Sequence, residues 1–236
     1  MLACVEIGGS GVETVTFADD GTIVRVDGAH RAAGAMLAIA TPGIVADNRV
    51  VAASNLGWYD VDPAAALELG APAAVVLNDA DAAALGELAL RDESDDIVYV
   101  SLGTGVGGAV AVAGRVVADN LFGHDGGHSD MACVCGRVGC LETVAAGWSL
   151  PTPLNAASLE GAARAVAIAI EKEPLATSEL VVIGGGLARR HPELVARIAR
   201  HVAGHRIVEP SAAPAGFKSA AAWGLRAVLA RDPIDV

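Results

Sequence analysis

Three cysteines with a histidine shortly before them carry the strongest chemical signal in the sequence. Cys133, Cys135 and Cys140 fall within eight residues, in the run CVCGRVGC, and both His124 and His128 precede them. Three thiolates and one imidazole complete a tetrahedral Zn²⁺ site, and four protein ligands make such a site structural rather than catalytic. The spacing favours zinc over reduced core cysteines beside an unrelated histidine. It leaves His124 and His128 as alternatives for the fourth ligand.

A carboxylate at the end of an apolar run is the second signal. Ala73–Leu77 predicts a strand that stops at Asn78 and Asp79, and Asp81–Arg91 predicts an alanine-rich helix. Open α/β sheets bind ligands at the carboxyl ends of their strands. A carboxylate there can accept the proton of a hydroxyl that attacks a phosphate. The alternative is that Asn78 or Asp79 caps the helix, and for the motif taken alone this is the better interpretation.

Glycine clusters follow three apolar strands, at Gly8–Gly11, Gly103–Gly108 and Gly184–Gly186. Without a Cβ, their backbone N–H groups can face a phosphate. The first two are not Walker loops, because no Lys-Ser/Thr follows, nor dinucleotide fingerprints, because a strand rather than a helix follows. Each cluster alone is more often a tight turn, but the set of three favours phosphate binding. Glu6, just before the first, is a candidate to hold Mg²⁺ through water, or a solvated strand-end carboxylate.

The elements around these clusters repeat. A strand, a glycine loop and a hairpin are predicted twice, over Ala3–Ile7, Val12–Phe17 and Thr22–Val26, and again over Ile97–Leu102, Ala109–Ala113 and Val116–Ala118. This order indicates an internal duplication. An apolar strand is expected over Leu37–Ile44. Helices are expected over Pro63–Leu69, Leu159–Ile170, His191–Val202 and Gly216–Ala230. Strands that alternate with helices predict an α/β protein.

Composition restricts the possible partners. The 236 residues are 53% hydrophobic and 19% charged, which is typical of a compact domain with a sizeable core. The net charge is −12 and only two lysines occur, so we expect no nucleic-acid partner. No apolar run is long enough to span a bilayer, and the N-terminus has no signal-peptide pattern. We therefore expect a cytoplasmic protein without a membrane partner, in which clustered cysteines bind metal rather than form disulfides.

The chain resembles the ROK family (repressors, open reading frames and sugar kinases), in its glucokinase-like sugar kinase branch. The runs that carry the resemblance are VEIGGSG at 5–11, TPGIV at 41–45, SNLGW at 54–58, LNDADAAALGE at 77–87, VSLGTGVGG at 100–108, GHDGGH at 123–128, CVCGRVGCLET at 133–143 and VVIGGG at 181–186. In this order they are far more specific than any one motif. The resemblance implies an α/β, duplicated ribonuclease-H-like fold of the actin and hexokinase type, with two lobes and a structural zinc site.

The same resemblance implies an ATP-dependent kinase that phosphorylates a hydroxyl of a hexose or related sugar, with Asp79 as the general base. The implied sugar ligands are Gly43, Asn78, Asp79, Asp125, His128 and Glu142. His128 would also join Cys133, Cys135 and Cys140 as a zinc ligand, with one ring nitrogen on the metal and the other on a sugar hydroxyl. Hexoses, amino sugars and cyclitols all stay open as substrates, since contacts worth about 1–3 kcal/mol each decide between them.

ATP and Mg²⁺ are assigned to the glycine clusters by the resemblance. The implied ligands are Glu6, Gly8, Gly9, Ser10, Gly103, Thr104, Gly105, Gly185 and Gly186. The first loop departs from the family pattern, because Glu6, Ser10 and Gly11 stand where Asp, Thr and Lys are usual. In the sugar site, Asp125 and Gly126 replace a glutamate and a larger apolar residue, which predicts an altered pocket.

Two lobes and a homodimer are expected from the resemblance. The first lobe is residues 1–77, with the first phosphate loop and a C-terminal helix, 218–236, that packs back on it. The second lobe is residues 78–217, with the second phosphate loop, the zinc site and the nucleotide-binding glycines. The chain is short for the family between Val26 and Leu37 and between Thr143 and Leu180. This shortening, with the altered first loop, leaves an alternative: a catalytically impaired sugar-binding or regulatory protein without a DNA-binding domain.

Overall fold

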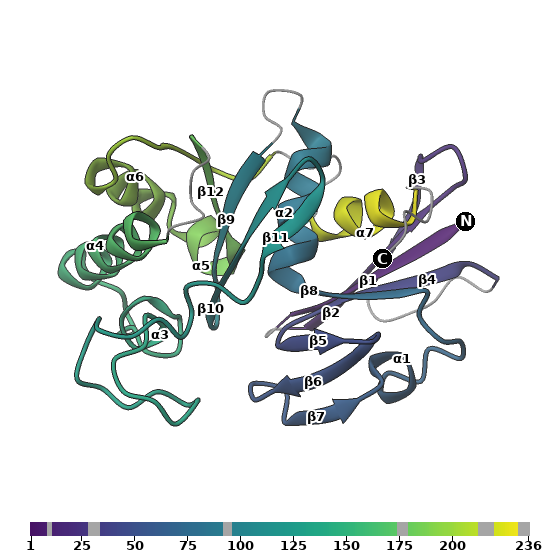
Figure 1. Ribbon diagram of the computed structural model, residues 1–236, viewed down its shortest axis with the longest axis horizontal. Helices are drawn as coiled ribbons and strands as arrows, with labels where there is room; N and C mark the ends of the chain where they lie inside the picture. The colour runs from purple at the N-terminus through teal and green to yellow at the C-terminus, as the bar shows by residue number, and fades with distance from the viewer. Residues whose placement is uncertain (9–10, 28–33, 92–95, 174–178, 212–219, 231–236) are drawn as a thin grey trace. The chain divides into compact units, whose positions relative to one another are not determined.

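A computed structural model describes residues 1–8, 11–27, 34–91, 96–173, 179–211 and 220–230. The chain forms two compact units (Figure 1). One consists of Met1–Leu90 with Ala220–Val236, and the other of Arg91–Ser219. Within the described ranges, no helix has both the length and the apolar character needed to cross a membrane.

The first unit is built on a mixed five-stranded sheet. Its strands are β1 (Leu2–Gly8), β2 (Gly11–Phe17), β3 (Ile23–Asp27), β4 (Met36–Thr41) and β8 (Val75–Asn78). They lie in the order β3-β2-β1-β4-β8, with β1 to β3 antiparallel and β4 and β8 parallel to β1. Because parallel strands end at the same edge of a sheet, Gly8, Thr41 and Asn78 all come to one edge.

One face of this sheet buries every second side chain, as the two-residue period of a strand requires. The buried cluster on it consists of Ala3, Val5, Ile7, Ala35, Leu37, Ile39, Ala64, Leu69 and Val76. Ala64 belongs to the short helix α1 (Pro63–Ala66), which starts where Asp62 caps the backbone N–H groups of the first turn. The expected helix Pro63–Leu69 is therefore present but shorter.

Helices α2 (Asp79–Leu90) and α7 (Ala221–Leu229) pack on each other and against the sheet. Two glycines allow their backbones to meet. A Cβ added to Gly86 would lie 1.8 Å from the carbonyl oxygen of Ala220. A Cβ added to Gly224 would lie 1.9 Å from that of Ala82. Any side chain at these two positions would push the helices apart.

A second, three-stranded sheet follows β4, where the sequence predicted one continuous strand over Leu37–Ile44. Its strands are β5 (Ile44–Ala46), β6 (Arg49–Ala53) and β7 (Trp58–Val61), in antiparallel order β5-β6-β7. The chain changes direction at Gly43, which has a φ of 101°. A Cβ there would lie 2.3 Å from the carbonyl oxygen of Ala52. Gly43 thus ends one strand and lets the next sheet pack closely.

The second unit repeats the plan of the first sheet. Its strands are β9 (Asp96–Leu102), β10 (Val106–Val112), β11 (Arg115–Ala118), β12 (Leu180–Gly184) and β13 (Arg206–Val208). They lie in the order β11-β10-β9-β12-β13, with β9 to β11 antiparallel and β12 and β13 parallel to β9. Strand for strand, this is the order and direction of the first sheet. The predicted duplication of an α/β, ribonuclease-H-like unit is confirmed.

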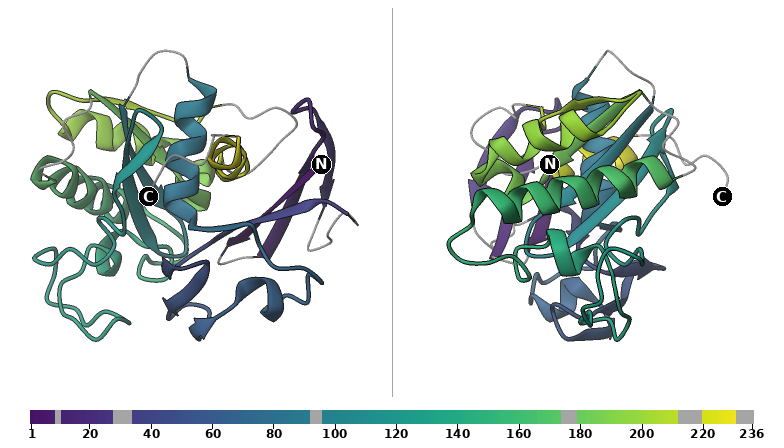
Figure 2. Two further views of the ribbon diagram at one scale, coloured as in Figure 1. Left: turned by 45° about the vertical axis from the view of Figure 1, so that its right-hand side comes forward. Right: turned by 90° about the vertical axis from the view of Figure 1, so that its left-hand side faces the viewer.

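The described part of the second unit contains four helices: α3 (Glu142–Ala145), α4 (Ala156–Lys172), α5 (Gly185–Arg190) and α6 (Pro192–His201). Figure 2 shows α4 and α6 side by side over one face of the sheet. They bury a core with the central strands that includes Val98, Val100, Leu159, Val166, Ile170, Val181, Ile183, Leu194 and Ile198. Helix α4 begins at a capping box, in which Asn155 accepts from the N–H of Ser158 at 2.9 Å and donates its own N–H to the Ser158 hydroxyl at 3.1 Å.

Candidate active site and metal centre

The three clustered cysteines converge in the second unit, and His124 joins them. One ligand atom each of His124, Cys133, Cys135 and Cys140 lies within 4.8 Å of the other three. The Cys135 and Cys140 sulfur atoms are 3.6 Å apart, and the Cys133 sulfur lies 3.8 Å from Nδ1 of His124. One imidazole with three thiols is the donor set of a structural Zn²⁺. The residues present therefore fit the metal that the sequence predicts.

A tight hairpin presents these thiols. Cys133 donates its N–H to the carbonyl of Arg137 at 2.7 Å, and Gly136 donates to the carbonyl of Cys133 at 2.9 Å. Burial opposes ionisation of Cys135, but hydrogen bonds from Arg137, Cys133 and Cys140 together outweigh it and lower the pKa of this thiol to about 7. A thiolate forms readily in such a setting, and thiolate is the form that binds metal. The fourth cysteine, Cys4, is buried in β1 of the first unit.

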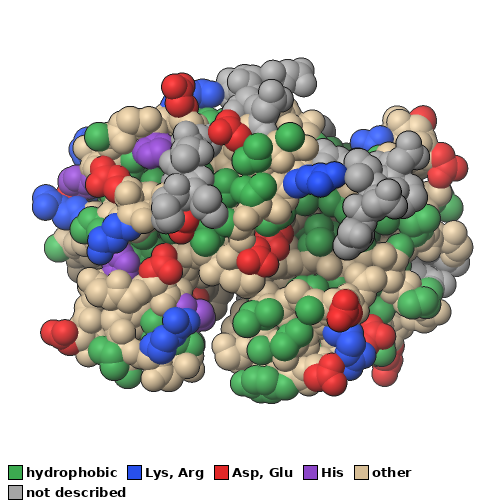
Figure 3. All heavy atoms as spheres, in the orientation of Figure 1, with side chains coloured by type: hydrophobic (Ala, Val, Ile, Leu, Met, Phe, Trp, Pro, Cys, Tyr) green, Lys and Arg blue, Asp and Glu red, His purple; other side chains and the backbone are tan. Residues whose placement is uncertain are grey.

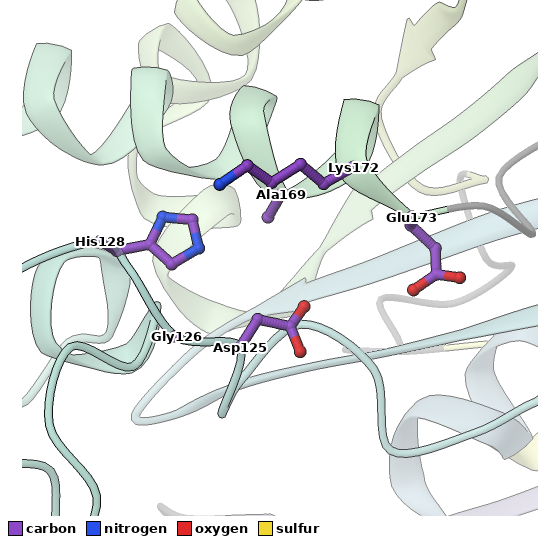
Figure 4. Close-up of a pocket in the computed structure, with 6 residues that line it drawn as sticks. All are labelled: Asp125, Gly126, His128, Ala169, Lys172 and Glu173. Carbon is purple, nitrogen blue, oxygen red and sulfur yellow. The ribbon is translucent and has the colours of Figure 1, made fainter.

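His128 is not part of the sulfur group, although the resemblance names it as a zinc ligand. Its backbone N–H donates to the carbonyl of Gly139 at 2.9 Å, but its ring lines a separate cavity of about 210 Å³ (Figure 4). The cavity is lined by Asp125, Gly126, His128, Ala169, Lys172 and Glu173. Burial, helped by the positive charge of Lys172, lowers the pKa of His128, and Asp125 opposes this only in part. The imidazole is therefore neutral at pH 7.

Asn78 and Asp79 lie where β8 of the first unit meets α2. The Asn78 amide donates to the carbonyl of Gly43 at 2.8 Å, and its oxygen accepts from the N–H groups of Ala80 at 2.8 Å and Asp81 at 3.3 Å. Asn78 thus caps the helix. Asp79 also accepts from Ala80, at 3.0 Å, but burial dominates and raises the pKa of its carboxyl to about 6. A carboxylate of this basicity at a strand end suits a general base.

The second and third glycine clusters lie together in the second unit. Gly103 donates its N–H to the carbonyl of Gly105 at 2.9 Å, which closes the turn between β9 and β10. A Cβ on Gly103 would lie 3.9 Å from the backbone nitrogen of Gly186, at the start of α5. Gly185 has a φ of 90°, and a Cβ on it would lie 2.4 Å from the carbonyl oxygen of Leu102. Only glycine allows this approach between the two clusters.

Glu142 lies against the second glycine cluster and not in the cavity of Figure 4. It is 9% exposed, and its Oε1 accepts a hydrogen bond from the N–H of Val106 at 2.9 Å. In the first unit, Glu6 is half-buried in β1 opposite Glu13, and Gly8 ends that strand. Gly9 and Ser10, which complete the first predicted phosphate loop, lie outside the described residues.

The family model described as "ROK family" matches residues 21–228. The chain belongs to the ROK family. A kanosamine kinase from Amycolatopsis mediterranei is 32% identical over 225 residues, which cover 79% of this chain and 72% of that protein. An N-acetylmannosamine kinase from Salmonella paratyphi B is 37% identical over 50% of this chain, and the match spans only 44% of that kinase.

The solved ROK structures agree on the fold. A glucokinase from Streptomyces griseus, in complex with glucose and AMPPNP, superposes with a TM-score of 0.74. The match covers 97% of this chain and 98% of the glucokinase at 21% identity. At this identity the likeness concerns the fold, which is the α/β ROK fold with two mixed sheets that the sequence predicts.

The ROK motifs could not have indicated two residues of the candidate site. Lys172 and Glu173 line the cavity with Asp125 and His128, yet they follow the helix that apolar periodicity ends at Ile170. No motif marks them, and only the packing of α4 brings them to the cavity.

Among the side chains that Figure 3 draws in colour, Lys and Arg are scattered rather than gathered into one basic patch.

Proposed function

We propose that this ROK protein is an ATP-dependent kinase that transfers the γ-phosphate of ATP to a hydroxyl of a hexose or related sugar. The observation that carries the proposal is the environment of Asp79. Asn78 serves as the helix cap, so Asp79 is not needed for that role, and burial raises the pKa of its carboxyl to about 6. The kanosamine kinase relative, aligned over most of both chains, supports the same class of reaction.

In the proposed reaction, Asp79 takes the proton of the attacking sugar hydroxyl. The hydroxyl oxygen forms a bond to the γ-phosphorus as the bond between that phosphorus and the bridging oxygen breaks, and ADP leaves with the electron pair. Backbone N–H groups of Thr104, Gly105, Gly185 and Gly186 would face the nucleotide, and Gly103 would shape the loop through its hydrogen bond to Gly105. Gly8, Gly9 and Ser10 are further proposed nucleotide ligands. Mg²⁺ supplies charge neutralisation at the phosphates when it is bound, and Glu6 would hold it through water.

We assign the zinc to His124, Cys133, Cys135 and Cys140, so that His124 takes the place that the resemblance gave to His128. Zinc bound there would cross-link the hairpin. His128, which is neutral at pH 7, then remains available for a sugar hydroxyl beside Asp125. Gly43 and Asn78 are further proposed sugar ligands. We also propose that the protein is cytoplasmic and forms a homodimer. Light scattering of the purified protein would test the homodimer.

Nitrogen-containing sugars are the first candidate substrates to test. Two relatives are kinases of kanosamine and of N-acetylmannosamine. In this chain the cavity beside His128 has two carboxylates, Asp125 and Glu173, and a single amine, Lys172. Carboxylates attract an ammonium group and accept hydrogen bonds from an amide N–H. We therefore propose amino or acylamino hexoses as the preferred substrate class.

The test is ADP release with Mg-ATP across hexoses, amino sugars, acylamino sugars and cyclitols, with the Asp79→Asn variant as control. Asn keeps the size of the side chain and its hydrogen-bond acceptor but not the base. We expect turnover with at least one sugar and a loss of at least about 100-fold in kcat in the variant. Zinc-loaded, folded protein that binds sugar but never Mg-ATP would instead identify the catalytically impaired sugar-binding protein.

A further inference from the structure

The Glu142 carboxylate lies between the metal centre and the second glycine loop, Gly103–Val106. Its Oε1 accepts from the N–H of Val106 at 2.9 Å, and its Oε2 lies 4.0 Å from the sulfur of Cys133. The side chain is 9% exposed. One buried carboxylate therefore contacts both a predicted metal ligand and the loop that we assign to the nucleotide phosphates.

Two glycines show how closely these parts pack. A Cβ on Gly105 would lie 2.5 Å from Oε1 of Glu142. A Cβ on Gly123 would lie 2.2 Å from the carbonyl oxygen of Val106. Gly123, the residue directly before His124, also accepts the N–H of Glu142 at 3.0 Å. The loop therefore rests on the segment that starts the metal centre, with no side chain between the two backbones.

Residues that follow the metal-binding cysteines in the sequence also form hydrogen bonds with the loop. Gly147 donates its N–H to the carbonyl of Gly103 at 2.8 Å, and Trp148 donates to that of Thr104 at 3.3 Å. The Ser149 hydroxyl donates to the carbonyl of Glu142 at 2.7 Å. Gly123 and residues 142–149, which flank the ligand-bearing stretch 124–140 in the sequence, thus both contact the loop. All of these hydrogen bonds lie within the second unit, and they connect the residues on either side of that stretch to the loop.

We propose that Glu142 is a positioning residue that couples metal occupancy to the geometry of the Gly103–Val106 loop. With the metal bound, the hairpin would be fixed, and Glu142 with it, so that Val106 keeps its acceptor and the loop keeps its shape. Without the metal, the thiols are free to separate, and the stretch from His124 to Cys140, which ends two residues before Glu142, is no longer fixed. The relevance of this coupling to nucleotide binding rests on the proposed kinase function, but the coupling itself does not.

Amide hydrogen exchange at Val106 tests the coupling directly, on the full chain with zinc and after removal of zinc by a chelator. In the wild type, we expect removal of zinc to speed exchange at Val106 by about tenfold or more, because the amide loses a charged acceptor. Glu142→Ala should show the fast rate even with zinc bound. Glu142→Gln, which keeps an acceptor oxygen, should retain most of the protection. The amide of Val100, in the buried strand β9 of the same unit, serves as the reference for unfolding of that unit.

Two results would overturn the proposal: a Val106 exchange rate that zinc removal leaves unchanged, or Val106 protection that survives in zinc-loaded Glu142→Ala. A second readout compares ligands. We expect Glu142→Ala to weaken Mg-AMPPNP binding about tenfold and to leave the sugar dissociation constant unchanged. A variant that weakens only sugar binding would make Glu142 a sugar ligand, as the resemblance implies. A wild type with zinc-dependent Val106 exchange but no AMPPNP binding would retain the coupling and contradict the kinase.

Discussion

At the scale of single residues, the basicity of Asp79 decides the pH profile of the proposed reaction. Its pKa, raised by burial to about 6, means that the base is ionised above that pH and protonated below it. We expect kcat/KM to be constant from pH 7 to 8 and to fall tenfold per pH unit well below pH 6. Initial rates in buffers of constant ionic strength measure this. A profile that falls only below pH 4 would mean that the Asp79 carboxyl has an ordinary pKa.

The same raised pKa has a consequence for stability. A carboxyl whose pKa is higher in the folded than in the unfolded protein stabilises the fold most below its unfolded pKa, near 4, and that contribution is lost as the pH rises through 6. Relative to wild type, Asp79→Asn should therefore gain stability between pH 4 and pH 6. The gain at pH 7 should be about 1–2 kcal/mol, since Asp79 is only half-buried and solvent screens it. Urea unfolding at pH 4, 5, 6 and 7 gives the comparison.

Alanine substitutions of the two histidines before the cysteines should have different effects on zinc binding. His124→Ala removes a side chain that lies among the three thiols, so we expect zinc affinity to fall at least about tenfold. His128→Ala should leave the zinc content of the purified protein unchanged and raise the KM for sugar. Metal analysis of both variants, prepared side by side, makes the comparison. Zinc loss from His128→Ala alone would restore the ligand set that the resemblance implies.

At the scale of elements, the contact between α2 and α7 depends on two glycines. Gly86→Ala would place a methyl group 1.8 Å from the carbonyl oxygen of Ala220, so the helices must separate. We expect a loss of about 2–3 kcal/mol in the free energy of unfolding. The control is Gly161→Ala in α4, where a Cβ meets nothing within 4 Å. That change should stabilise by up to about 1 kcal/mol, through helix propensity alone.

The sequence was sufficient to predict the helices and strands that have a strong apolar periodicity. Strands β1 and β9 and helix α4 agree with their predicted ranges within a few residues, and α4 starts earlier only because Asn155 and Ser158 form a cap. The sheet of β5, β6 and β7 was missed, because its strands are short and largely exposed and give little alternation. Helix α5 was missed because it starts with two glycines, which are poor helix formers.

The candidate site was predictable by residue type but not by arrangement. Cysteine spacing gave three of the four members of the metal group. It did not distinguish His124 from His128, because both are near enough in the chain to reach the thiols. The hydrogen bond from the His128 N–H to Gly139 ties its backbone to the hairpin, while its ring points to Asp125 and Lys172. Such a choice depends on backbone turns that no residue pattern specifies.

At the scale of the whole molecule, each of the two units is built on a five-stranded sheet, and the two sheets have the same strand order. Each ends its parallel strands at one edge, and in both units a proposed functional group stands there: Asn78 and Asp79 after β8, and Gly185 and Gly186 after β12. The duplication thus provides two equivalent sheet edges, and the two edges carry different residues. One carries a carboxylate with a raised pKa, and the other carries glycines that leave backbone N–H groups accessible.

Helix α7 belongs to the first unit although it follows the second unit in the chain. During synthesis the ribosome therefore releases β1, β4, β8 and α2 well before the helix that packs against Gly86 exists. The second unit is continuous in sequence, so it can complete its sheet while translation proceeds. The first unit must wait with part of its apolar surface uncovered until Ala221–Leu229 emerges. The first unit is therefore completed after the second, and the face of α2 that packs on α7 stays uncovered in the interval.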